Sequence, residues 1–388
     1  MCEPRLLKAA RTGRGNYDFT NVYQNVRSLL AESDYVIGNL ETPLAGEAAG
    51  YVSSLFQFNA PDSFAIAAKE AGIKLLLTAN NHCLDRGLEG LERTVRVLEE
   101  NGIAHAGTFS EPGNRGNTYF EIGDTRIAVI SYTYGTNYSN NHILLSEDER
   151  GYINLLRPQT ESYFIYRRQK RALKDRIRYK IANSFHFDKK YYVRKLLGLP
   201  VNQAHEDDNL VPDTLEPYLH VLLEDIVEAK KNADFVLFCP HMGGQFNPVP
   251  GAFSNYLASF AVEQGVDAVV ASHTHVVQKA VFLHGVPCFY SLGNFSMSPN
   301  SVYLLHENLP KYGIAAHLYL EDARIVKTSF SILRILEEDF LTVYPVDDYA
   351  KRCSPDEMKL LSMEVRQIFQ TVTGNEIDGD LFRKEYIL

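Results

Sequence analysis

The sequence predicts an α/β protein, because short apolar segments typical of buried strands alternate with longer segments that carry apolar residues at helical spacing. A second observation is that a polar cluster follows directly after several of the apolar segments. Open α/β sheets place their sites at the carboxyl ends of the strands, so these clusters are the candidate functional residues. The chain has 388 residues and is 45% hydrophobic, which allows it to bury a large core.

The first half of the chain contains two pairs of strand and helix. Pro61 lies near the start of the first helix and Gly72 just past its end, while Gly102 ends the second helix. The expected elements are, in order, a strand at 34–38, a helix at 61–71, a strand at 74–78, a helix at 88–101 and a hairpin that turns at 122–125.

The second half repeats this alternation. Its expected elements are, in order, a helix at 215–232, a strand at 234–239, a helix at 252–264, a strand at 267–271, a hairpin within 277–290, and two strands within 312–334. A last helix at 354–373 begins at Ser354 and Pro355 with acidic residues in its first turn. We expect one domain over residues 1–345, and a helical extension packed on it over residues 346–388.

Residues 157–200 interrupt the alternation and indicate an insertion. Between residues 157 and 195 there are 13 Lys and Arg residues against three acidic ones, interleaved with eight aromatic residues. One interpretation is a solvated helical excursion that its aromatic side chains pack together. The other is a lid or arm that binds an anionic small molecule or polymer, or an anionic membrane surface. The sequence leaves both interpretations open.

The composition argues against several classes of protein. A net charge of −9 disfavours a general nucleic-acid binder, so no nucleic-acid partner is expected. No run of about 18 apolar residues predicts a membrane span, and no signal peptide opens the chain. Five cysteines are present without CxxC spacing, which disfavours a zinc-thiolate or redox site. As written, the sequence predicts a cytoplasmic protein.

The polar clusters combine a carboxylate, an amide and imidazoles, which are ligands that divalent cations take. His273 and His275 are two residues apart, so in an extended segment both side chains would point to the same side. A single polar cluster, or the His-x-His spacing alone, is a weak signal for a metal site. The whole series of clusters, in this order and each behind an apolar strand, is specific. The candidate metal ligands are Glu41, Asn81, His241, His273 and His275.

Two metal ions about 3.5–4 Å apart can activate a water and hold the oxygens of a phosphoryl group, and such a pair needs a bridging carboxylate. Glu41 is the candidate bridge. His82 is the candidate general acid, since imidazole titrates near neutral pH. Arg86, Asn39 and Asn294 are candidates for substrate binding, while a surface, capping or turn role for each stays open.

Five blocks of this sequence together resemble a known family. They are Asn-Leu-Glu-Thr-Pro-Leu, Asn-Asn-His-x-x-Asp-x-Gly, His-x-Gly, His-x-His-x-x-Gln and Ser-Leu-Gly-Asn-Phe. Blocks of these kinds are the signature of the CapA family of poly-gamma-glutamate capsule synthesis proteins, a branch of the calcineurin-like metallophosphoesterases. The resemblance runs from about residue 4 to residue 297, interrupted by the insertion.

The resemblance implies a four-layer α/β/β/α sandwich of two mixed sheets, metallophosphoesterase-like, with two divalent metal ions (Mn, Zn or Fe). It implies that Asn81 ligates metal and that His82 acts near the substrate oxygen. Asp85 belongs to the same block and receives the role of orienting His82.

The remaining ligands are also implied by position. His241 matches the single downstream histidine ligand of the superfamily. His273 and His275 match its terminal Gly-His-x-His pair, with Ser272 in place of the glycine. Glu41 falls where the superfamily has a metal-bridging aspartate, and its extra methylene shifts the carboxylate.

The start of the chain departs from the family pattern. Members begin with an apolar strand that ends in Gly-Asp, whereas this chain starts Met1-Cys2-Glu3. A late start or a truncated copy would each explain the difference, and each predicts an incomplete metal centre with weak metal binding. Association with the cell envelope is expected if the true N-terminus lies upstream.

Two functions follow from the resemblance and the residues. The first is a metal-dependent hydrolase of the phosphoesterase type that acts in capsule or cell-envelope polymer biosynthesis. The alternative is a non-catalytic component that binds a polyanion or assembles the capsule machinery, which the basic insertion favours. A serine hydrolase is disfavoured because no Gly-x-Ser-x-Gly motif is present.

Overall fold

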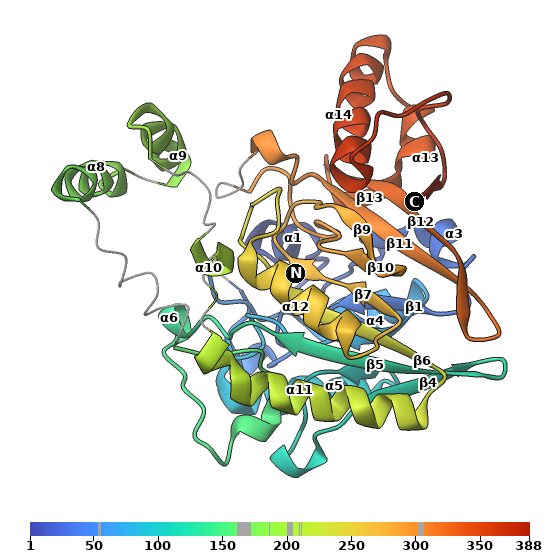
Figure 1. Ribbon diagram of the computed structural model, residues 1–388. Helices are drawn as coiled ribbons and strands as arrows, with labels where there is room; N and C mark the ends of the chain where they lie inside the picture. The colour runs from blue at the N-terminus through green and yellow to red at the C-terminus, as the bar shows by residue number, and fades with distance from the viewer. Residues whose placement is uncertain are drawn as a thin grey trace.

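The computed structural model describes residues 1–52, 56–160, 172–185, 187–199, 205–208, 210, 212–301 and 306–388. These residues form a mixed α/β fold that contains parallel and antiparallel strands, as the sequence predicts (Figure 1). The strands divide into three hydrogen-bonded sheets, of which the largest is mixed, where two mixed sheets were expected.

The largest sheet has seven strands and carries most of the site. Its central strands β5, β6, β7 and β10 are parallel, and β4 and β9 pair antiparallel at the two edges. The strands are, in spatial order, β4 (Thr118–Ile122), β5 (Thr125–Thr133), β6 (Phe235–Met242), β7 (Ala268–Val270), β10 (Val286–Phe289) and β9 (Ala280–Leu283), with β8 (Ser272–His273) paired to β6.

Two smaller sheets complete the strands. One is parallel and consists of β1 (Val36–Asn39), β2 (Ile73–Leu77) and β3 (Ala104–Ala106). The other is antiparallel and consists of β11 (Tyr312–Glu321), β12 (Arg324–Glu337), β13 (Leu341–Pro345) and β14 (Tyr386–Ile387). The pairing of β14 with β12 makes the 346–388 segment part of a sheet, not only a helical extension.

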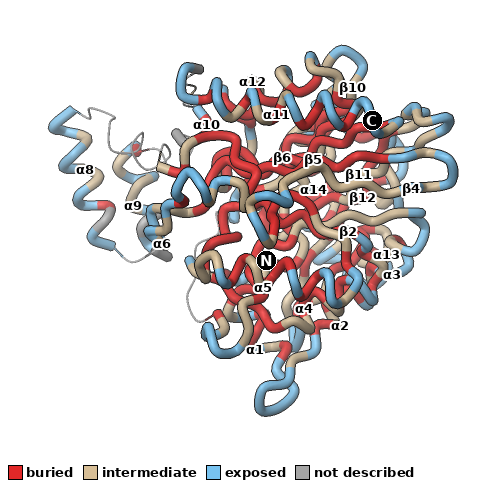
Figure 2. Tube along the Cα trace, turned by 90° about the horizontal axis from the view of Figure 1, so that it is seen from below, coloured by how far each residue is buried: buried red, intermediate tan, exposed pale blue. Residues whose placement is uncertain are grey.

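Alternation along the strands explains how the layers pack. Ile127 and Val129 of β5 face Leu75 and Leu77 of β2, so the large sheet packs on the small parallel sheet. Ala128, on the other face of β5, packs with α11 (Pro212–Asn232) and α12 (Ala252–Glu263). Helices α4 (Ser63–Glu70) and α5 (Gly87–Glu100) cover the far face of β2 (Figure 2).

The remaining elements connect or flank these layers. The helix start predicted at Ser354 and Pro355 is confirmed, and it forms a capping box in which the Glu357 amide donates to the serine hydroxyl. Several short helices and the strands β3, β13 and β14 were not predicted from the sequence. The further helices are α1 (Pro4–Ala9), α2 (Thr20–Tyr23), α3 (Arg27–Leu30), α6 (Tyr138–Asn141), α10 (His205–Asp208), α13 (Val346–Ala350), α14 (Pro355–Thr373) and the 3-10 turns Glu47–Ala49, Pro112–Asn114, Arg150–Tyr152 and His306–Asn308.

The predicted insertion contains two helices, α8 (Leu173–Asn183) and α9 (Phe187–Leu196), which lie beside each other away from the body (Figure 1). Arg157 is an exception, because it is buried and its Nε donates to the carbonyl of Tyr134, so it belongs to the domain core. Part of the insertion, residues 161–171, lies outside the described residues. Among the described helices, none has the length and apolarity needed to cross a bilayer.

Candidate metal centre

The predicted ligands meet at one edge of the sheets. Glu41 follows β1 and Asn81 follows β2, while His241 lies at the end of β6 and His273 in β8. Because β1 and β2 are parallel, and β6, β7 and β8 are parallel, the carboxyl ends of both groups of strands carry these side chains. The structure therefore brings together residues from four distant segments of the chain.

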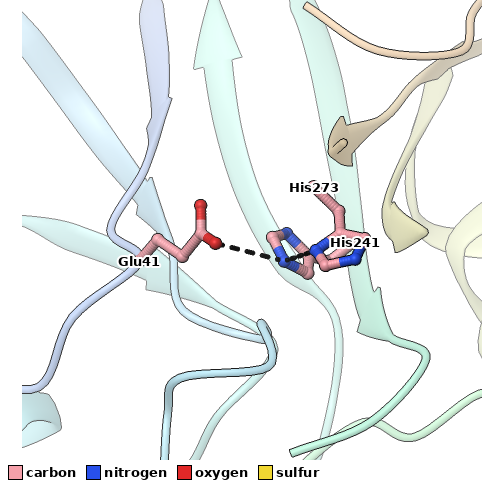
Figure 3. Close-up of side chains that lie close together, drawn as sticks. All are labelled: Glu41, His241 and His273. Carbon is pink, nitrogen blue, oxygen red and sulfur yellow. Dashed lines mark hydrogen bonds and ion pairs between the residues drawn. The ribbon is translucent and has the colours of Figure 1, made fainter. Parts of the chain in front are cut away.

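Glu41, His241 and His273 form the centre of the cluster. Oε1 of Glu41 lies 3.7 Å from Nε2 of His241, and Nδ1 of His273 lies 3.1 Å from the same nitrogen (Figure 3). One ligand atom from each residue lies within 4.8 Å of the others. All three side chains are buried, with residue exposures between 1% and 6%.

Asn81 adds a fourth donor to this cluster. Its side-chain oxygen lies 2.8 Å from Nε2 of His241. An amide oxygen, a carboxylate oxygen and an imidazole nitrogen therefore approach the same nitrogen, and a single proton can satisfy only one of these contacts. A divalent cation coordinated by all four groups would satisfy them together.

His275 faces the same carboxylate from another direction. Its Nε2 lies 3.6 Å from Oε1 of Glu41, and its Nδ1 lies 2.9 Å from Oδ1 of Asn294. Asn294 in turn donates from Nδ2 to the carbonyls of His275 and Pro310. Asn294 thus orients a candidate ligand, and its proposed contact with substrate stays a prediction.

Orphaned polar atoms support a cation at this position. Oε1 of Glu41 and Nε2 of His273 are buried and make no hydrogen bond within the described protein. Leaving a buried polar atom without a partner costs about 1–3 kcal/mol. The opposite ring nitrogens of His241 and His275 are held by Ser272 and Asn294, as is typical of imidazoles that ligate metal. The donor set fits a divalent cation.

The electrostatics keep these imidazoles in the form that binds metal. Burial lowers the pKa of His241 well below its usual value, and the neighbouring His273 and His275 lower it further. Burial likewise lowers the pKa of His273 and of His275, although Glu41 opposes the shift at His275. Neutral imidazole is the metal ligand, so a proton competes weakly with the cation.

His82 and Asp85 form a second, adjoining pair. Nδ1 of His82 lies 2.6 Å from Oδ2 of Asp85, which also accepts a hydrogen bond from the amide of Phe58. The ring of Phe58 packs edge-on against His82 at a centroid distance of 4.4 Å. The contact would allow Asp85 to orient His82, and this role stays a prediction.

The predicted extended conformation of the His-Thr-His segment is wrong. His273 has φ of 124° and His275 has φ of 59°, so the chain bends between them. Such angles cost roughly 1–3 kcal/mol and persist where the surroundings hold them. The two rings converge, with centroids 6.2 Å apart, because the chain bends and not because of strand alternation. Gly243 allows Thr274, the residue between the two histidines, to pack against its backbone, since a Cβ at residue 243 would lie 2.5 Å from Cγ2 of Thr274.

The two other predicted substrate residues, Asn39 and Arg86, contact protein groups at and near the cluster. Asn39 donates to Oε2 of Glu41 over 3.2 Å and so positions that carboxylate. Arg86 donates to the backbone carbonyls of Asp85, Gly50 and Gln57, so it holds a neighbouring loop. Neither contact tests substrate binding, which stays a prediction for both residues.

Sequence reasoning missed the loop that follows β5. Nδ2 of Asn137 lies 3.3 Å from both ring nitrogens of His82, and its Oδ1 accepts from Asn81 over 3.1 Å. Tyr134 packs on His273 at a centroid distance of 4.5 Å. The sequence carried a signal for this loop, because Tyr134 and Asn137 come shortly after a buried strand, as the candidate ligand Asn81 does.

The chain is similar to proteins named for capsule or PGA biosynthesis. Two relatives are the capsule biosynthesis protein CapA of Bacillus anthracis, 26% identical over 72% of this chain, and the PGA biosynthesis protein CapA of Bacillus subtilis, 22% identical over 71%. The chain spans 54% and 56% of their lengths.

Solved structures resemble the chain only weakly. A hypothetical protein from Thermus thermophilus matches with a TM-score of 0.36 and 16% identity, over 82% of this chain and 89% of its own. A putative 5'-nucleotidase from Staphylococcus aureus matches with a TM-score of 0.37 and 14% identity, over 91% of this chain and 54% of its own.

The family described as bacterial capsule synthesis protein PGA_cap matches residues 1–298. The chain therefore belongs to the PGA_cap family of bacterial capsule synthesis proteins.

Proposed function

We propose that this chain is a metal-dependent hydrolase of the metallophosphoesterase type that acts in the biosynthesis of a capsule or cell-envelope polymer. The observation that carries the proposal is the convergence of Glu41, Asn81 and His273 on Nε2 of His241 in a buried site. We also propose that the sheets and helices of this fold form a four-layer α/β/β/α sandwich.

Four residues would hold one divalent ion, namely Glu41, Asn81, His241 and His273, and Glu41 with His275 would contribute to a second. When bound, such ions supply an activated water and stabilise charge on a phosphoryl oxygen. Oε1 of Glu41 faces both His241 and His275, which suits a carboxylate shared between two ions. Asn39 holds the other carboxylate oxygen and so fixes the direction of the shared one.

His82 would transfer a proton to or from the leaving oxygen of the substrate. Asp85 accepts the proton of Nδ1, so Nε2 is the nitrogen left to exchange a proton with a leaving oxygen. Burial of the pair and the packing of Phe58 against the ring fix its orientation. A positioned general acid contributes about 10²–10⁴-fold to rate.

The substrate class rests on the relatives. The names of the two Bacillus proteins refer to capsule and PGA biosynthesis, which supports an anionic envelope polymer, of the poly-gamma-glutamate kind, or its precursor. Because this chain spans only part of those proteins, their whole activity is part of the proposal.

The test is hydrolysis of an aryl phosphate monoester and diester by purified protein supplied with Mn²⁺, Zn²⁺ or Fe²⁺. We expect metal-dependent turnover that His82→Ala lowers at least about 100-fold, with metal content unchanged. His220→Ala is the matched control, because that histidine is exposed and distant in the chain. Bound metal without turnover of these esters or of poly-gamma-glutamate would contradict the hydrolase and favour a non-catalytic polyanion-binding component.

A further inference from the structure

Helix α8 carries an apolar stripe that faces solvent. The stripe consists of Leu173, Ile177 and Ile181, which are 72%, 54% and 46% exposed. Residues four apart lie on the same side of a helix, so the three side chains form one line. Phe185, just past the helix, is 44% exposed. Single exposed apolar residues are common, whereas an aligned set marks an interaction surface.

Basic residues lie on both sides of the apolar stripe. At about 100° of rotation per residue, Lys180 and Arg176 fall on one side of the stripe and Lys174 and Arg178 on the other. The acidic residue of this helix, Asp175, falls on the opposite face and lies 3.7 Å from Arg178. The exposed face therefore combines apolar side chains with positive charge.

The opposite face of α8 lies toward α9, and this packing sets the orientation of the stripe. Ala182 is fully buried, and the guanidinium of Arg194 in α9 lies 5.5 Å from the ring centre of Tyr179. Lys195 of α9 pairs with Glu307 over 2.8 Å, which ties the two helices to the body. Figure 2 shows the described part of α8 as largely exposed and lying beyond the body.

We propose that α8 docks on the surface of an anionic lipid bilayer. A helix with an apolar face and flanking Lys and Arg lies in the plane of a membrane interface, with the apolar side chains among the acyl chains and the cations at the headgroups. A soluble polyanion would use the charges but would leave Leu173, Ile177 and Ile181 in water. The apolar stripe therefore favours the bilayer.

Docking would also orient the candidate metal centre. On the N-terminal side of the insertion, Arg157 packs on the ring of Tyr134, and Tyr134 packs on His273. It returns through α10, where Asp207 accepts hydrogen bonds from Ser254 at the start of α12. Helix α8 thus extends from the side of the body that carries the site (Figure 1). The docking inference holds whether or not the site is a hydrolase.

The test uses the absence of tryptophan from this sequence. Ile177→Trp introduces a single indole into the stripe, and Leu360→Trp places the matched control on α14, where Leu360 is 52% exposed. Each protein is mixed with vesicles of phosphatidylcholine alone or with added phosphatidylglycerol. We expect a blue shift and quenching by brominated lipid for Ile177→Trp with phosphatidylglycerol vesicles, and no shift for Leu360→Trp.

Vesicle flotation distinguishes the contribution of the apolar stripe from that of the basic residues beside it. Combined Leu173→Ser, Ile177→Ser and Ile181→Ser should abolish flotation. Combined Lys174→Gln, Arg176→Gln and Lys180→Gln should lower affinity about 100-fold, since each cation near an anionic surface contributes about fivefold. Leu360→Ser with Met363→Ser, both exposed on α14, should float as wild type. Unchanged metal content in all variants separates loss of docking from misfolding.

Three results would overturn the proposal. The first is a blue shift of Ile177→Trp that is as large with pure phosphatidylcholine as with added phosphatidylglycerol. This result would show that the basic residues do not contribute to docking. The second is a shift without lipid that grows with protein concentration, which would show that a second copy covers the stripe. The third is absence of flotation together with binding to soluble poly-glutamate that the serine variant retains.

Discussion

The side-chain oxygen of Asn81 lies 2.8 Å from Nε2 of His241, although 160 residues separate them in the chain. The contact joins the end of the small parallel sheet to the end of the large one, so the site forms only when the two sheets pack. Metal affinity and the packing of the sheets are therefore linked. A cation that binds the folded state alone stabilises it by mass action.

Asp85→Asn tests the orientation of His82. The amide can donate to Nδ1 where the carboxylate accepts from it, so the ring is expected to adopt the wrong tautomer. We expect turnover of an aryl phosphate to fall about 10–100-fold with metal content unchanged. Asp148→Asn, an exposed carboxylate, is the control. Equal activity of the two variants would contradict the role of Asp85.

Asn137→Ala tests the loop that the sequence analysis missed. The amide contacts both Asn81 and His82, so its loss removes a partner from a ligand and from the proton donor. We expect metal affinity to fall about tenfold or more, measured by calorimetric titration of metal-free protein. Asn140→Ala is the matched control, because Asn140 is exposed on the same short helix. Wild-type affinity in Asn137→Ala would remove this residue from the site.

Gly243→Ala tests the bend at the two histidines. The new Cβ would meet Cγ2 of Thr274 at 2.5 Å, and the backbone has φ of 114°. We expect a loss of about 2 kcal/mol or more in the free energy of unfolding and weaker metal binding. Thr274→Ser removes Cγ2 but keeps the hydroxyl that donates to Val276 and Ser291, so it should restore part of both losses.

Gly285→Ala controls for backbone strain, because Gly285 has φ of 85° and a Cβ there would meet no atom within 4 Å. Its cost should be that of a positive φ alone, about 1–2 kcal/mol, with metal affinity unchanged. If Thr274→Ser fails to improve Gly243→Ala at all, the steric explanation is wrong.

The pH dependence of stability follows from the buried histidines. The pKa of His241, His273 and His275 is lowered in the folded state, chiefly by burial, so below about pH 6.5 the unfolded chain binds more protons. The free energy of unfolding of metal-free protein should then fall as pH falls, by up to about 1.4 kcal/mol per pH unit for each histidine. Urea unfolding over the range of about pH 7.5 to 5.5 measures this slope.

Glu3 would mask part of that slope. Burial raises the pKa of Glu3 to about 6, so its protonation favours the folded state as pH falls, which is the opposite sign. The measurement therefore uses the Glu3→Gln background. There, His273→Gln should flatten the slope and the exposed His220→Gln should leave it unchanged. Equal slopes in the two variants would show that His273 is not buried in its neutral form.

The candidate ligands Glu41, Asn81 and His241 could be identified from the sequence because each lies at or just after the end of an apolar strand, and strand position is a local property. Glu41 and Asn81 lie at one edge because β1 and β2 are parallel, and the packing of the two sheets brings them to His241 at the end of β6. The conformation of His273 could not be predicted in this way. Its positive φ depends on contacts with Gly243 and Thr274, which come from the packed structure and not from its neighbours in sequence.

The fold shows the same division between local and long-range determinants. The hairpin at 122–125 and the capping box at Ser354 were predictable because turn and cap residues act over a few positions. Strand β14 was missed because its two residues carry no alternation, and it is held by pairing to β12 and by the burial of Tyr386. Arg157 was assigned to the insertion by charge alone, although it is buried against Phe253 and Tyr134.

If Glu41, Asn81, His241 and His273 bind a divalent cation, the metal content of the purified protein will show it. Elemental analysis of protein brought to equilibrium by dialysis against buffer that contains Mn²⁺, Zn²⁺ or Fe²⁺ should find bound metal in the wild type. We expect His241→Ala to lose this metal, while the variant His317→Ala, at a partly buried histidine that contacts Ser331, keeps it. Wild-type protein without metal, or equal metal in the two variants, would show that these four residues do not form a cation site.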